Sequence, residues 1–321
     1  MTSASPPASA DTVATKIRDA KLPRECIPTE WLTKPEVWEA LLHDMPMTAM
    51  IRNLATMTRV GLVTQTSQAT TTILDQLRDR QRLHKARVHP IAILSALTTY
   101  KSGHGGRGHS TWAPAAKVVD ALDAAFYLTF DTVVPANKRM LLALDVSGSM
   151  TSGAVAGVDG LTPRIASAAM SLVTAATETA HAFVAFTAAA KGYGGQWGGG
   201  ESGITTLSIS PRQRLDDVVA ELGRHPMGGT DCALPMIWAQ KHRVDVDTFV
   251  IYTDNETWAG NVHPVQALRA YRDARGIPAK LVVVGMTSTG FSIADPADAG
   301  MLDVVGFDTA TPPVIADFAR A

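Results

Sequence analysis

The feature of this chain that most constrains its fold is an alternation, after residue 138, between short apolar runs and amphipathic segments. The apolar runs are RMLLALDV (139–146), HAFVAFT (181–187), ITTLSI (204–209), DTFVIYTD (247–254), AKLVVVGM (279–286) and MLDVVGF (301–307). Segments with helical spacing lie between and after them, at about 163–180, 211–223, 233–242, 263–275 and 312–321. Continuous apolar runs are typical of strands buried on both faces of a parallel sheet. Strands that alternate with helices predict a doubly wound α/β domain, here over residues 138–321.

Residues 16–137 have a different pattern, in which apolar residues recur at the three- and four-residue steps of a helix. In PEVWEALLHDM (35–45) these positions form one apolar face. Pro90 and Pro114 stand where helices would begin, because proline is tolerated in the first helical turn. No run here has the pattern of a strand, so we predict a stack of about four or five antiparallel helices. Residues 1–15, rich in Ser, Ala, Pro and Thr, are predicted to form a disordered tail.

Composition and charge limit the classes of protein to which this chain can belong. With 46% hydrophobic and 18% charged residues, the composition is that of a soluble globular protein. No apolar run is long enough to span a bilayer, and the N-terminus lacks the apolar core of a secretory signal. Cys26 and Cys232 provide neither a disulfide framework nor a metal-binding pair. We therefore expect a cytoplasmic protein without a membrane partner. The net charge of −1 disfavours a general nucleic-acid-binding protein but permits a local basic patch.

Three segments place oxygen-bearing side chains at the carboxyl ends of strands, where ligands bind in an open parallel sheet. The segment DVSGSM supplies Asp145, Ser147 and Ser149, the loop MGGTD supplies Thr230, and YTDNE supplies Asp254. The alternate spacing in the first segment lets three oxygens face one point as the chain leaves the strand. We predict that these five side chains form one metal site.

The chemistry of the five side chains indicates a hard cation. All are oxygen ligands, with no His or Cys among them, which favours Mg²⁺ over zinc and is also compatible with Mn²⁺ or Ca²⁺. Only two of them are charged, so a bound cation would stay net positive and keep a position open for an acidic group of a partner. The alternative interpretation is that Ser, Thr and Asp after a strand simply cap the next helix.

Long runs across nearly the whole chain from Leu22 onward match one protein family in order. They are KPEVWEALLHDMPMTAMIRNL, ARVHPIAILSALTTYKSGHGGRG, ALDAAFYLTF, DVSGSM, GGTDCALPMIWAQK, YTDNETWAGNVHP and AKLVVVGMTSTGFSIADPADAGMLDVVGFDT. In these runs the chain resembles the C-terminal part of the Ro autoantigen family, the RNA-binding proteins with a TROVE domain. The resemblance implies an α-helical segment of HEAT-like repeats, followed by a von Willebrand factor A domain of Rossmann-like α/β fold. It also implies that the five predicted ligands form the metal-ion-dependent adhesion site of that domain.

The resemblance also implies a function. Ro proteins bind small noncoding Y RNAs on a ring of helical repeats, hold the 3′ ends of misfolded RNAs in its hole, and are not enzymes. Bacterial members are linked to exoribonucleases in RNA quality control. We therefore expect noncoding RNA as a partner, with an exoribonuclease or an acidic protein ligand as further candidates. Family members have a longer helical region before the part that matches Leu22, so a complete ring would need several chains or a helper subunit. The alternative function, from a different class, is a metal-dependent protein-adhesion module that binds no RNA.

A basic stretch separates these two functions. Residues 76–109 hold seven Lys and Arg against one acid, Asp79. The candidate RNA-contacting residues are Arg78, Arg80, Arg82, Lys85, Arg87, Lys101, His104 and Arg107. A local excess of positive charge is the electrostatic footprint expected of phosphate contacts. The alternative is a solvated helix face followed by a flexible loop. RNA binding needs this stretch, whereas adhesion does not.

Overall fold

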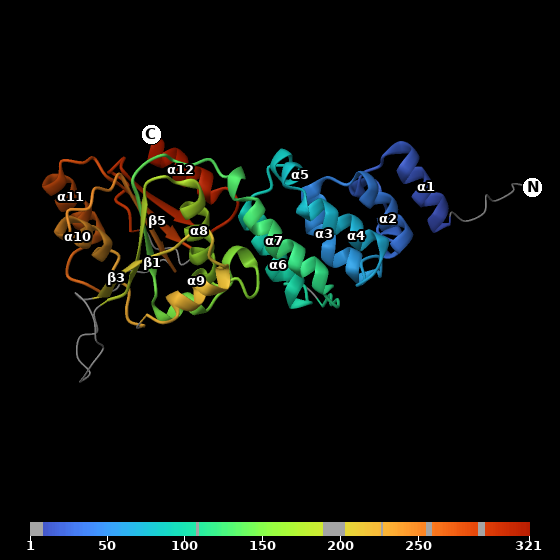
Figure 1. Ribbon diagram of the computed structural model, residues 1–321, viewed down its shortest axis with the longest axis horizontal. Coiled ribbons are helices and arrows are strands. Elements are labelled where there is room, and N and C mark those ends of the chain that lie inside the picture. Colours follow the sequence, from blue (N-terminus) through green and yellow to red (C-terminus); the bar gives the residue numbers. More distant parts are fainter. Residues whose placement is uncertain (1–8, 107–108, 189–202, 226, 255–258, 288–292) are drawn as a thin grey trace, which may run out of the picture. The chain divides into compact units, whose positions relative to one another are not determined.

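The chain divides into a helical unit, Met1–Thr132, and an α/β unit, Val133–Ala321 (Figure 1). The computed structural model describes residues 9–106, 109–188, 203–225, 227–254, 259–287 and 293–321. The predicted order of a helical segment followed by an α/β domain is therefore confirmed. None of the helices in the described ranges combines the length and the apolar character needed to cross a membrane.

The described part of the helical unit contains more helices than the sequence predicts. The α-helices are α1 (Ala10–Ala20), α2 (Pro35–Asp44), α3 (Met47–Arg59), α4 (Gln68–Arg78), α5 (Arg80–Lys85), α6 (Pro90–Ser102) and α7 (Ala116–Leu128). Single 3₁₀ turns lie at Arg24–Cys26, Trp31–Thr33 and Phe130–Thr132. Helix α5 escapes prediction because it is short and buries only Leu83. Helix α4 begins in a threonine-rich run, which weakens its apolar stripe.

The predicted disordered tail is wrong for residues 10–15, which belong to α1. The hydroxyl of Ser9 caps this helix by accepting a hydrogen bond of 3.2 Å from the Thr12 amide. Ala14 and Ile17 are buried on one side of α1, which packs on α2. A cap and two buried side chains thus outweigh a composition rich in small polar residues. Residues 1–8 lie outside the described ranges.

Helix α6 packs on both α3 and α7. Tyr100 of α6 is buried, and its hydroxyl lies 2.9 Å from that of Thr58. The same hydroxyl accepts a hydrogen bond of 3.1 Å from the buried amide of Ala115, just before α7. Trp112 stacks on the Tyr100 ring and donates its indole N–H to the Tyr100 carbonyl at 2.9 Å. One tyrosine therefore holds the segment between α6 and α7 in place.

We expect Tyr100→Phe to destabilise this region by about 1–3 kcal/mol, because the Ala115 amide would lose its partner in the protein interior. Hydrogen exchange of the full chain, followed by mass spectrometry, should show faster exchange in peptides from α6 and α7. Peptides from the α/β unit provide the internal control and should not change. Equal exchange rates in both proteins would show that water or another acceptor replaces the hydroxyl.

The α/β unit is built on a six-stranded sheet in the order β3-β2-β1-β4-β5-β6. The strands are β1 (Met140–Asp145), β2 (His181–Phe186), β3 (Ile204–Leu207), β4 (Thr248–Thr253), β5 (Lys280–Gly285) and β6 (Met301–Val305). The helices are α8 (Pro163–Thr177), α9 (Leu215–Leu222), α10 (Leu234–Lys241), α11 (Pro264–Arg275) and α12 (Thr311–Arg320), with 3₁₀ turns η4 (Gly148–Thr151) and η5 (Val155–Gly157). All neighbouring strands are parallel except β3, which runs antiparallel to β2. The sequence predicts no helix between β2 and β3, and a connection without a helix suits an antiparallel pair of strands.

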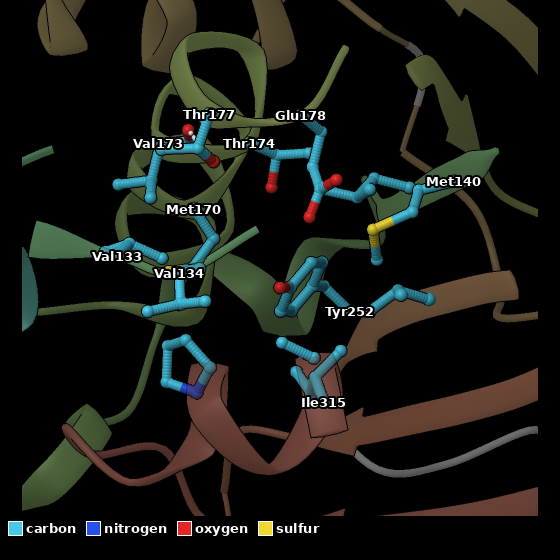
Figure 2. A pocket seen from close by; sticks show the side chains of 14 residues that line it. Val133, Val134, Met140, Met170, Val173, Thr174, Thr177, Glu178, Tyr252 and Ile315 are labelled. Atoms are coloured by element: carbon cyan, nitrogen blue, oxygen red, sulfur yellow. Dashed lines mark hydrogen bonds between the residues drawn. The ribbon is translucent and has the colours of Figure 1, made fainter. Parts of the chain in front are cut away.

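The sheet is covered on both faces, which explains its continuous apolar runs. On one face Leu141 and Ala143 of β1 share a buried cluster with Met236 of α10 and Leu268 of α11. On the other face, residues of β1 and β4 meet α8 and α12 around a small cavity of about 30 Å³. Figure 2 shows its lining, with the Glu178 carboxylate and the Tyr252 hydroxyl among apolar side chains. This volume holds no more than a few waters, so the cavity is part of the core packing.

The α/β unit begins at Val133, whereas the sequence prediction starts it at 138. The buried carboxylate of Glu178 explains the earlier start, because it accepts hydrogen bonds from the amides of Ala136 and Asn137. Arg320 of α12 adds a hydrogen bond of 2.8 Å to the Pro135 carbonyl. The segment before β1 is thus anchored to α8 and α12, although its own sequence forms no regular element.

Candidate metal site and basic surfaces

The candidate metal site is centred on Asp145, the last residue of β1. Strand β1 is an interior strand of the sheet. Its last residue therefore lies at the carboxyl-terminal end of the parallel strands, where ligands bind in such sheets. The side chain is only 1% exposed, and Oδ1 accepts a hydrogen bond of 2.7 Å from the Ser147 amide. This contact bends the chain back over the carboxylate, so the residues after the strand stay beside it.

Ser147 and Ser149 extend the site from the turn η4. Their hydroxyl oxygens are 3.1 Å apart, as the alternate spacing in the sequence predicts. Ser147 is buried, whereas Ser149 is exposed. The group therefore has an inner wall at Asp145 and Ser147 and a side that solvent reaches at Ser149.

The capping alternative does not account for these side chains. Helix α8 is capped by Thr162, whose hydroxyl accepts a hydrogen bond of 3.3 Å from the Ile165 amide. Ser147 precedes η4 but forms no side-chain cap with it. The oxygens of Ser147 and Ser149 thus face the group around Asp145 without serving a helix end.

Thr230 reaches the site from the loop before α10. It is 1% exposed, and its hydroxyl donates a hydrogen bond of 3.2 Å to Oδ2 of Asp145. The loop is held by Thr187 at the end of β2, whose hydroxyl donates to the Gly229 carbonyl at 2.9 Å. A Cβ at Gly228 would lie 2.7 Å from both the Thr187 hydroxyl and the Ala188 carbonyl, so only glycine fits.

The fifth predicted ligand, Asp254, follows β4 and is partly exposed. Its carbonyl accepts a hydrogen bond of 2.9 Å from the Thr287 hydroxyl, which fixes the turn after the strand. The preceding residue, Thr253, is fully buried and donates a hydrogen bond of 2.8 Å to Oδ2 of Asp145. Thr253 is absent from the predicted set. The available signal is a hydroxyl at the end of an apolar run, immediately before an acidic residue.

The electrostatics of the site suit a cation. Burial raises the pKa of the Asp145 carboxyl to about 6, and the nearby negative charge of Asp254 contributes to the increase. Hydrogen bonds from Ser147 and Thr253 act in the opposite direction and favour the carboxylate. A hard cation would relieve both the burial of Asp145 and its repulsion with Asp254. The oxygen-only set of Asp145, Ser147, Ser149, Thr230 and Asp254 therefore fits Mg²⁺.

The predicted RNA-contacting residues fall into two separate groups in the helical unit. The first, called the α5 cluster here, consists of Arg78, Arg80, Arg82, Lys85 and Arg87. The second, the α6-end cluster, consists of Lys101 and His104. All seven residues are exposed. Arg107 lies outside the described residues.

Helix α6 keeps the two clusters apart. It begins at Pro90, just after the α5 cluster, and reaches Lys101 about 17 Å further along its axis. Figure 1 shows α5 and the chain that leaves α6 at opposite ends of the helical unit. The sequence prediction of a single basic surface is thus wrong. The residues form one stretch in the sequence, but the length of helix α6 separates the α5 cluster from the α6-end cluster.

Local contacts reduce the free charge of one cluster and order the turn that carries part of the other. Arg80 forms an ion pair with Asp131, with Nη2 and Oδ2 2.8 Å apart, so part of its charge is already matched. The glycine-rich turn after α6 is held by backbone hydrogen bonds of 2.9 Å from Gly105 to Ser110 and from Trp112 to Gly103. The described part of this turn is therefore a bonded hairpin, which differs from the flexible loop of the alternative interpretation.

Comparison with known proteins agrees with this architecture. The sequence model of the Ro60 vWA domain matches residues 139–319, and that of the TROVE domain matches residues 15–101. The RNA-binding protein RO60 of Deinococcus radiodurans is 47% identical over 308 residues, which are 96% of this chain and 55% of that protein. The RNA-binding protein RO60 of Caenorhabditis elegans is 41% identical over 312 residues, 97% of this chain and 46% of that protein.

A solved structure shares the fold of both units. The crystal structure of the Deinococcus radiodurans RO (RSR) protein superposes with a TM-score of 0.88 at 46% sequence identity. The match covers 97% of this chain and 60% of that one. This chain thus spans about half the length of the relatives that it matches. With TROVE and Ro60 vWA domains in succession and this level of identity, the chain belongs to the Ro60 family.

Proposed function

We propose that this chain acts in a Ro-like RNA-binding protein, whose partners are small noncoding Y-type or misfolded RNAs in cytoplasmic RNA quality control. The observation that carries this proposal is the similarity, through both units, to relatives named as RNA-binding proteins. The exposed α5 cluster supports it, because exposed Arg and Lys side chains are available for phosphate contacts. The proposal gives the chain a binding role and no catalytic one. An exoribonuclease would supply the RNA cleavage.

A further part of this proposal concerns assembly. The chain spans about half the length of its relatives. We propose further copies of the chain or a helper subunit as partners that add helices to a ring of HEAT-like repeats. Analytical ultracentrifugation with and without RNA tests this point. A monomer that binds RNA on its own would show that the ring is dispensable.

For the α/β unit we propose a divalent-cation site, with Mg²⁺ the expected ion and Mn²⁺ or Ca²⁺ also compatible. Asp145, Ser147, Ser149, Thr230 and Asp254 would hold it, directly or through water. The bound ion would supply an electrophilic position for an acidic group of a partner. The buried carboxylate, which accepts hydrogen bonds from surrounding residues and lies near the exposed Ser149, supports this assignment.

One observation favours the second function, a metal-dependent adhesion module without RNA. Met227 is 59% exposed. A Cβ atom placed on Gly148, the residue between Ser147 and Ser149 in the sequence, would lie 3.7 Å from the Met227 sulfur. An apolar side chain beside a cation site suits a protein ligand with an acidic group next to an apolar one. The proposed RNA surface lies on the helical unit and does not include Met227. Replacing Met227 with Ser would therefore weaken binding of such a protein and leave RNA binding unchanged.

Direct binding of RNA by the full chain separates the two functions. We expect a labelled single-stranded RNA to bind with an affinity that falls steeply between about 50 and 200 mM salt, because phosphate contacts release counterions. Fluorescence anisotropy measures this affinity, and EDTA should leave it unchanged if RNA binds the helical unit alone. Negligible binding at the low end of this salt range would rule out the RNA function for this chain and leave the adhesion module.

A further inference from the structure

Arg164 is an unusual residue in the α/β unit because it is a buried arginine near the start of a helix. The residue is 8% exposed. Its Nε and Nη2 atoms are buried and have no hydrogen-bond partner among the residues that the structure describes. These two nitrogens form the side of the guanidinium that normally binds a carboxylate in a bidentate manner. Burying guanidinium nitrogens without hydrogen-bond acceptors is costly, so the presence of this residue calls for an explanation.

The position of Arg164 along the chain adds a second cost. It is the second residue of α8, directly after Pro163. The first turn of a helix carries the positive end of the helix dipole, where acidic side chains are favoured and cations are not. Neither local helix energetics nor burial accounts for an arginine here. The site around it remains as the explanation.

Arg164 lies beside the candidate metal site. Helix α8 packs against β1, which ends in Asp145, and against η4, which carries Ser149. The carboxylate of Asp145 is the charge that favours the ionised form of Arg164 and so limits the decrease in its pKa caused by burial. A Cβ atom placed on Gly223, at the end of α9, would lie 3.7 Å from Nη1 of Arg164. The guanidinium thus lies near the end of α9 and interacts with the charge of Asp145.

We infer that Arg164 is a fixed positive charge that weakens cation binding at Asp145 and strengthens the binding of a carboxylate to the bound cation. This inference rests on the proposed metal site. A cation next to Arg164 is repelled by it, whereas an anion that joins the cation is attracted by both charges. Such a site retains its ion weakly by itself and more firmly once an acidic ligand is present. Cation and ligand would then bind as a coupled pair.

The test compares the full chain with its Arg164→Met, Arg164→Gln and Arg164→Lys variants, using Mn²⁺ as the probe. Water-proton relaxation measures the Mn²⁺ dissociation constant, and sodium acetate then serves as the carboxylate that displaces water from the bound ion. We expect the Met and Gln variants to bind Mn²⁺ about tenfold more tightly. They should also need a few-fold more acetate for half-displacement. The Lys variant keeps the charge and should resemble the parent in both measurements.

Opposite changes in the two affinities distinguish this role from a structural one, because a damaged site would lose both ligands. Met and Gln variants that bind Mn²⁺ no more tightly than the parent would overturn the inference. A Lys variant that behaves like the Met variant would also overturn it, since the fork of hydrogen-bond donors rather than the charge would then matter. A parent that binds no Mn²⁺ would instead disprove the metal site itself, which separates the two failures.

Discussion

Replacing Asp145 with asparagine is expected to weaken Mn²⁺ binding by about a hundredfold or more, because the buried carboxylate provides most of the attraction for the ion. Asparagine keeps the shape of the side chain, and its amide oxygen can still accept the hydrogen bond from Ser147. Isothermal titration calorimetry of the full chain measures the affinity. Ser149→Ala is the graded comparison and should cost less, since it removes one exposed neutral ligand. Unchanged affinity in the asparagine variant would refute the assignment.

The same substitution should stabilise the protein when no metal is present. The pKa of the Asp145 carboxyl rises from its ordinary value of 3.8 to about 6 in the folded chain. Ionisation therefore opposes folding: the penalty is absent below about pH 4, grows as the pH rises, and is complete above about pH 6. The difference in pKa corresponds to about 3 kcal/mol, which is an upper bound for the gain at neutral pH. Urea denaturation in EDTA should show about half of this gain at pH 5. A gain that is independent of pH would point to a cause other than ionisation.

Removing three charges of the α5 cluster should weaken RNA binding by about a hundredfold near 0.1 M salt. The variant replaces Arg82, Lys85 and Arg87 with glutamine, and each lost phosphate contact should lower the salt slope by about 0.7 on a single strand. Arg80 is left in place because its ion pair with Asp131 already matches part of its charge. Fluorescence anisotropy over a salt series measures both the affinity and the slope.

A matched control separates local contacts from net charge. Lys16, Arg18 and Lys21 lie in or directly after α1, are exposed, and belong to neither basic cluster. Their replacement by glutamine removes the same total charge and should change the affinity by no more than a few-fold. Equal losses in the two triple variants would show that RNA senses only the overall charge. An α5 variant that binds like the parent would place the RNA on another surface.

The strands, and the position of the candidate ligands at or after strand ends, could be predicted because each rests on a local pattern. A fully buried strand such as β4 needs a continuous apolar run, and the acidic residue after it is visible in the sequence. Thr253 was missed, although its hydroxyl directly precedes Asp254 in the sequence. Its contact with Asp145 depends on the register between β1 and β4, where Leu144 pairs with Tyr252, and those strands are far apart in the sequence. Arg164 was equally hidden, since a basic residue after proline reads as an exposed position on a helix.

The errors in the helical unit have a related cause. A stretch of basic residues suggests one surface only when the chain stays in one place, and helix α6 carries Lys101 away from Arg87. The start of α1 depends on one capping hydroxyl and on packing against α2, with Ala14 and Ile17 buried, which composition alone does not reveal. Features that depend on packing between distant segments are therefore the hardest to predict from a single sequence.

The pairing of β1 with β4 has a consequence for the order of events during synthesis. A nascent chain that has emerged only as far as β2 already holds Asp145, but neither Thr230 nor Thr253 exists yet. The helical unit closes its own contacts within residues 1–132. At ordinary rates of translation, about 10 s pass between the completion of that unit and the emergence of β4. Cation capture would therefore be a late event on the ribosome, and a chain that terminates before residue 253 would lack the Thr253 hydroxyl that donates to the β1 carboxylate in the finished protein.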